Sequence, residues 1–92
     1  MNEELLLAGL RTDLGISAKV YDDRLRDRIR TAQAWISEEG ITLEDTAADR
    51  DLVVMYAGYL WRSRMTGEAM PRMLRYALNN RLFAEKGKGA GA

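Results

Sequence analysis

The chain has 92 residues, a mass of 10.4 kDa and equal numbers of acidic and basic side chains. This length allows one compact domain, because separate cores arise only in chains beyond about 250 residues. The sequence contains no cysteine and no histidine, which excludes disulfides, zinc fingers, iron–sulfur clusters and catalysis by Ser-His or Cys-His groups. We therefore expect a protein that is not an enzyme and that needs no cofactor.

The composition is that of a globular chain, with 47% apolar and 30% charged residues. No apolar run approaches the roughly 18 residues that span a bilayer. Glu3 and Glu4 stand where a signal peptide would carry basic residues. We expect neither membrane insertion nor secretion.

Acidic and basic residues are unevenly distributed along the chain. Residues 1–46 carry ten acids and six bases, whereas residues 47–92 carry four acids and eight bases. Eleven of the bases are arginine, the cation suited to bidentate contacts at interfaces. The two halves have opposite net charge, which favours pairing of one half with the other half of a neighbouring subunit.

The hydrophobic pattern predicts an all-α fold, a small bundle of about four helices, because no short segments alternate as strands do. Asn2 is placed to cap a first helix that runs from Glu3 to about Leu14, with Gly15 as its left-handed end. The segment 17–23 leads into a second helix, which ends at Gly40. Its predicted buried face consists of Leu25, Ile29, Ala32 and Ile36.

Two further helices follow the loop 41–45. Thr46 and Asp49 have the spacing of a capping box for a third helix, which runs to about Arg64 and is broken by Thr66 and Gly67. Pro71 suits the first turn of a fourth helix, which we expect to end near Lys86. Residues 1–86 form the predicted domain, and the glycine-rich segment 87–92 forms a flexible tail.

The third helix is apolar on two opposite sides, since residues 52–61 include no charged side chain. One side holds Leu52, Val53, Tyr56, Tyr59 and Leu60. The other side, with the spacing i, i+4, i+7, i+11, consists of Val54, Gly58, Trp61 and Met65. A central core helix and a subunit interface both explain this pattern. Glycine within a helix costs about 1 kcal/mol relative to alanine, so we expect another backbone to approach closely at Gly58.

A second candidate interface lies on the second helix, where Arg24 and Arg28 share one flank with Trp35. Like charges four residues apart repel each other by a few tenths of a kcal/mol, and an acidic partner would relieve this repulsion. A solvated basic flank, offset by nearby aspartates, is the alternative.

The fourth helix has a predicted core face of Leu74, Ala77, Leu78 and Leu82, within which Arg81 requires a carboxylate from the acidic half or an escape to solvent. Its opposite face and the tail form a predicted contact surface for another protein. This surface consists of Arg72, Tyr76, Asn79, Phe83, Lys86 and Lys88. An unused surface and an unused tail are the alternative.

The sequence gives little support for a metal site or a catalytic nucleophile. The acidic pairs 38–39 and 44–45 lack calcium-loop spacing, and Ser17, Ser37 and Ser63 lack the context of a nucleophile elbow. We expect no metal site and no catalytic serine.

Residues 5–83 resemble the head-to-tail connector (adaptor or head completion) proteins of tailed bacteriophages and prophages. The strings that carry the resemblance are Gly40-Ile41, Asp51-Leu52, Met55-Tyr56-Ala57, Leu60-Trp61-Arg62-Ser63-Arg64, Met70-Pro71-Arg72-Met73-Leu74-Arg75 and Leu78-Asn79-Asn80-Arg81. Before them, only the short leading helix and the entry Tyr21-Asp22-Asp23 follow the family pattern.

The resemblance implies a structural protein of the virion, made in the cytoplasm of a bacterial host. It would assemble as a ring, commonly of twelve subunits, beneath the portal, extend the DNA channel without reading sequence, and dock a stopper or tail protein. The contact surface on the fourth helix and the tail would then bind the portal or tail protein. A head-to-tail ring agrees with the opposite charges of the two halves.

Two other readings stay open. A small helical DNA-binding, packaging or regulatory protein would place its carboxy-terminal arginines on phosphates, but zero net charge argues against it. A helix-turn-helix also needs a shorter connection than residues 40–46 and a less apolar second helix. The third reading is an orphan helical domain of a toxin-antitoxin pair.

Overall fold

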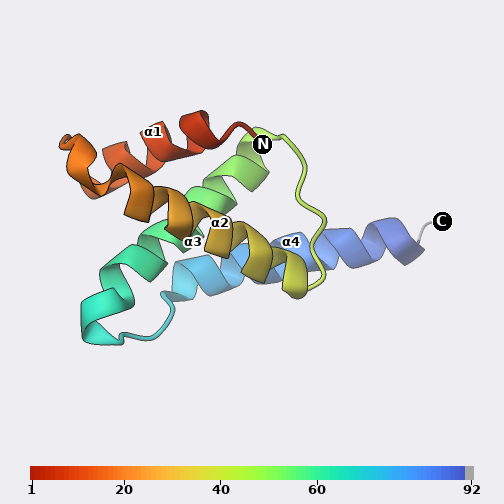
Figure 1. Ribbon diagram of the computed structural model, residues 1–92. Coiled ribbons are helices and arrows are strands. Elements are labelled where there is room, and N and C mark those ends of the chain that lie inside the picture. The colour runs from red at the N-terminus through yellow and green to blue at the C-terminus, as the bar shows by residue number, and fades with distance from the viewer. Residues whose placement is uncertain (91–92) are drawn as a thin grey trace.

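The computed structural model describes residues 1–90, and within them it confirms the all-α prediction. These residues form four α-helices, and Figure 1 shows that α4 extends beyond the others at its carboxy-terminal end. The elements are α1 (Glu3–Leu14), the 3-10 helix η1 (Lys19–Tyr21), α2 (Asp22–Glu38), α3 (Ala47–Thr66) and α4 (Arg72–Ala90).

Local signals fix the helix ends largely as predicted. The Asn2 side chain accepts hydrogen bonds from the backbone N–H groups of Glu4 and Leu5, at 3.0 and 3.2 Å, and so caps α1. Gly15 and Gly67 end α1 and α3 with φ values of 67° and 64°, a conformation that costs glycine little. Gly40 follows α2 with a φ of 101°.

The capping box at the start of α3 forms only in part. Thr46 accepts a hydrogen bond from the backbone N–H of Asp49 at 3.2 Å. The Asp49 carboxylate does not return to Thr46, because it binds Arg81 of α4 and the backbone N–H of Glu44 instead.

The core surrounds α3, which contacts each of the other three α-helices. The predicted face of α2 is confirmed, since its four members have no exposed surface. The largest fully buried side chains are Leu6, Leu10, Leu25, Ile29, Ile36, Val53, Leu74 and Leu78. Helix α4 contributes only one narrow face to this core, which leaves most of its circumference outside it.

The predicted end of the fourth helix is wrong. Helix α4 does not stop near Lys86 but continues to Ala90. Lys88 explains part of this, because its ammonium binds Glu44 at 2.8 Å and thereby holds the extra turn to the loop before α3. The flexibility of the segment 87–92 stays a prediction, and residues 91–92 lie outside the described residues.

The core predicts a large effect at Ile29, which has no exposed surface. Replacement Ile29→Ala removes apolar contacts and leaves a cavity, so it should lower the free energy of unfolding by about 2–5 kcal/mol in urea denaturation. The exposed replacement Arg24→Ala on the same helix is the control and should change it by about 0.5 kcal/mol at most. Equal effects of the two replacements would contradict this placement of the core.

Candidate assembly interface

Arg81 attaches α4 to the rest of the fold, although it lies in the apolar face of that helix. Its guanidinium donates to the Asp49 carboxylate at 2.8 Å, to the Glu85 carboxylate at 2.8 Å and to the Thr42 carbonyl at 2.7 Å. The predicted need for a carboxylate is confirmed, but its predicted source is wrong. Both carboxylates come from the basic half, because α3 begins beside α4 and Glu85 lies one turn further along α4.

Burial and hydrogen bonding have opposite effects on the pKa of a carboxylate in this network. Burial raises the pKa of Asp49, which is only 3% exposed, but hydrogen bonds from Arg81 and from the backbone N–H of Glu44 hold that pKa below its ordinary value. Hydrogen bonds from Arg81 and Thr42 lower the pKa of Glu85 from 4.5 to about 2. The carboxylates in turn raise the pKa of Arg81. All three groups are therefore charged at neutral pH.

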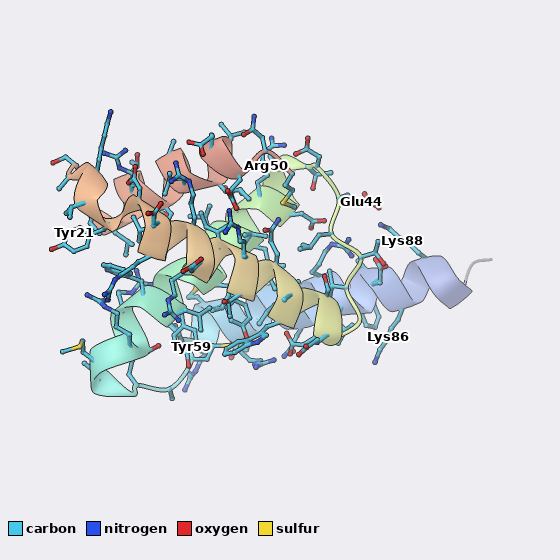
Figure 2. All side chains as sticks on the ribbon, in the orientation of Figure 1. Tyr21, Glu44, Arg50, Tyr59, Lys86 and Lys88 are labelled. Atoms are coloured by element: carbon cyan, nitrogen blue, oxygen red, sulfur yellow. The ribbon has the colours of Figure 1, made fainter. Side chains whose placement is uncertain are left out.

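Two ion pairs made by α4 join it to the acidic half of the same chain. Arg75 binds Glu39 at 3.1 Å, and Lys88 binds Glu44 at 2.8 Å. In Figure 2, Lys88 lies on the side of α4 that faces Glu44, whereas Lys86 lies on the opposite side. The pairing of opposite halves thus occurs within the monomer at these two positions. Pairing between subunits stays a prediction.

The outer face of α4 forms a ridge of five residues, Arg72, Tyr76, Asn79, Phe83 and Lys86, here called the α4 ridge. All five are exposed, with exposed fractions of 57% for Tyr76 and 80% for Phe83. The first four of these residues are predicted from the sequence to lie opposite the core face, and Leu74 and Leu78 on that face are each 1% exposed. Two exposed aromatic rings on one line favour contact with another chain.

The candidate stripe on α3 lies mostly inside the monomer. Val54 and Trp61 are 9% and 8% exposed, and Gly58 is buried too. Val54 packs toward Gly9 of α1, and the Trp61 ring meets the Tyr21 ring edge-on at 5.7 Å. Within this stripe only Met65 projects, with 83% of its surface exposed. A central core helix, packed within the monomer, therefore accounts for both apolar sides of α3.

The expected close backbone at Gly58 is wrong. A Cβ atom there would meet the guanidinium of Arg62, one turn along the same helix, at 3.3 Å. Gly58 instead lines a cavity, and its missing side chain leaves space there.

The candidate residues on α2 come together only in part. Trp35 is 45% exposed, and its ring meets Tyr56 edge-on at 6.3 Å. Arg24 is exposed and Arg28 half-buried, and neither takes part in an ion pair among residues 1–90. Their place in a subunit contact stays a prediction.

A groove between α3 and α4, here called the α3–α4 groove, was not predicted from the sequence. It consists of two cavities of about 200 and 340 Å³, and Met55 lines both of them. Gly58, Arg62, Pro71 and Leu74 line the first, and Ala48, Asp51, Ala77 and Ala84 line the second. The spacing of small residues on both helices is a signal that could have indicated it, since Ala77 and Ala84 are seven residues apart.

Among residues 1–90, no group of histidine, cysteine or acidic side chains is arranged to hold a metal ion. No helix in that part of the chain has the length and apolarity needed to cross a membrane. Comparisons with protein-family models, with curated proteins and with solved structures found no match.

The Arg81 network predicts a strong asymmetry between two arginine replacements on α4. Arg81→Met leaves the buried Asp49 carboxylate without its cation, which should lower the free energy of unfolding by about 3–5 kcal/mol. Arg75→Met removes a half-exposed ion pair and should cost at most about 1 kcal/mol. Urea denaturation of both variants measures this difference. An Arg81→Met protein as stable as Arg75→Met would show that the network does not hold α4.

The same network predicts a loss of stability in acid. Because the pKa of Glu85 is lower in the folded chain, its stabilising effect is complete above its ordinary pKa of 4.5 and disappears as the pH falls to about 2. Asp49 acts in the same direction. Unfolding measured across this interval should show a smaller pH dependence for Glu85→Gln than for the wild type. Identical slopes would contradict the assignment.

Proposed function

We propose that the chain is a structural subunit of a phage or prophage head-to-tail connector. It assembles as a ring beneath the portal, extends the DNA channel and docks a stopper or tail protein. The observation that carries this proposal is the α4 ridge. The core face of α4 is satisfied inside the monomer, while its outer face presents Tyr76 and Phe83 to solvent, as expected of a helix that contacts another chain.

The resemblance to connector proteins adds support, because three of its strings lie around the junction of α3 and α4. Residues 60–64 lie in the last two turns of α3 and residues 70–75 lead into α4, with the turn at Gly67 between them. Residues 78–81 include Arg81, which fixes α4 to the start of α3. The resembling residues therefore set the direction of the α4 ridge.

A nucleic-acid-binding function is the second candidate, and the geometry favours it less. Helix α2 ends at Glu38 and α3 begins at Ala47, so the connection is longer than a helix-turn-helix turn. The second helix of this pair is buried, whereas a recognition helix presents polar side chains to a groove. In the connector proposal, DNA passes through the ring without sequence-specific contacts.

The proposal predicts a ring of defined size. Native mass measurement compares the purified chain alone with its mixture with a portal protein. At least in the mixture, we expect a portal-bound oligomer whose mass is one high multiple of the subunit mass. Negative-stain images of the same sample should show a ring with a central opening.

DNA binding supplies the contrasting measurement. The connector should show no strong affinity for duplex DNA at micromolar protein. Salt-dependent DNA binding by a chain that neither forms rings nor binds portal would contradict the connector proposal and support the second candidate.

A further inference from the structure

The α4 ridge and the α3–α4 groove are complementary surfaces on one chain. The ridge carries two exposed aromatic rings, at Tyr76 and Phe83, which are seven residues apart and therefore about 10.5 Å apart along α4. The two cavities of the groove follow one another along α3, since the first is lined from within residues 54–62 and the second from within residues 48–55. Gly58 and Asp51, which line one cavity each, are also seven residues apart on α3.

The cavities are large enough for the rings. A cavity of about 150 Å³ accepts a benzene molecule, and the two cavities of the groove measure about 200 and 340 Å³. Their walls combine small side chains with Met55, a flexible side chain that adapts to aromatic partners. An amphipathic helix that lays its apolar side chains in such a groove is a common mode of protein recognition.

Charge matches the two surfaces as well. The exposed acids Asp13 and Asp51 line the groove, and Arg72 and Lys86 lie at the two ends of the ridge. None of these four side chains takes part in an ion pair among residues 1–90. Arg62 adds one positive charge to the groove, and Asp49 and Arg81 neutralise each other there. The groove keeps a negative balance opposite a positive ridge.

We propose that the α4 ridge of one copy of this chain lies in the α3–α4 groove of the next copy. This inference rests on the proposed function, because it supplies the subunit contact of the ring. It assigns the ridge to the neighbouring subunit in place of the portal contact expected from the sequence. Since the ridge and the groove are different surfaces, the contact is heterologous and repeats from copy to copy, which closes a ring when the rotation allows it.

The ring also sets the direction of the docked helix. Successive copies in a large ring differ by a small rotation, so the docked α4 runs nearly parallel to the α4 that lines the groove. Tyr76 then enters the cavity beside Gly58, where Asp13 and Arg62 offer partners for its hydroxyl group. Phe83 enters the cavity beside Ala84, and Lys86 lies near Ala48 and Asp51.

Replacement of Phe83 in the α4 ridge tests the proposed contact between copies. Phe83→Glu should weaken self-association by at least about tenfold in sedimentation equilibrium, because it places a carboxylate in an apolar cavity beside Asp51. Val20→Glu is the matched control, since Val20 is 78% exposed and lies between α1 and α2, away from the groove. Circular dichroism checks that both variants keep their helices.

Cysteine cross-linking tests the direction of the docked helix without removing either aromatic ring, since the chain contains no cysteine of its own. The double variant Ala48→Cys with Lys86→Cys should give a ladder of disulfide-linked oligomers on mild oxidation. The double variant Ala48→Cys with Arg72→Cys should give none, because Arg72 lies at the other end of the ridge. The reverse result would overturn the parallel arrangement.

The outcomes separate this inference from the proposed function. Rings of normal size formed by Phe83→Glu would overturn the groove contact and leave the connector proposal standing. If the Ala48→Cys, Lys86→Cys variant cross-links as expected but the wild-type chain does not bind portal, the groove contact is supported and the connector proposal is contradicted. A chain that stays monomeric at all concentrations, with or without portal, would overturn both.

Discussion

The position of α4 depends on one buried ion network. Helix α4 contributes only a narrow apolar face to the core, so Arg81, which donates to Asp49 of α3 and to the Thr42 carbonyl, fixes where its carboxy-terminal half lies. An apolar contact would tolerate a small rotation of the helix, whereas a planar guanidinium with these two partners outside α4 does not. The direction of the α4 ridge and the width of the α3–α4 groove both follow from this attachment.

The network also explains why one chain uses its opposite charges internally. Removing Arg81 and Asp49 from water is costly, and several hydrogen bonds are needed to offset that cost. The ion pairs of Arg75 with Glu39 and of Lys88 with Glu44 lie on the same helix at half-exposed positions, where each contributes little alone. Together they hold α4 against the loop before α3, and they leave Arg72 and Lys86 as the cations that face outward.

The sequence predicted the helices well and the tertiary contacts poorly, for physical reasons. Caps such as Asn2 and Gly67 act on their own neighbours, so their effect is visible in a short segment. Arg81 was recognised as needing a carboxylate, but its partner Asp49 was read as part of a capping box, since spacing along the chain does not show which group lies nearer in space. The groove was missed because it arises from the angle between two helices, and small side chains on each helix alone are compatible with close packing or with open space.

The burial of α3 on both sides limits how this chain can assemble. A domain of this size has few apolar residues, and Val54 and Trp61, which were candidates for the subunit contact, are already covered by α1 and by Tyr21. Assembly must therefore use side chains that the core does not need. Helix α4 supplies them, because a helix that buries one face against a small bundle keeps the rest of its surface free. The ridge on α4 carries the aromatic rings, and another side of α4 forms one wall of the groove. Because the same helix contributes to both surfaces, each copy can bind the next identical copy.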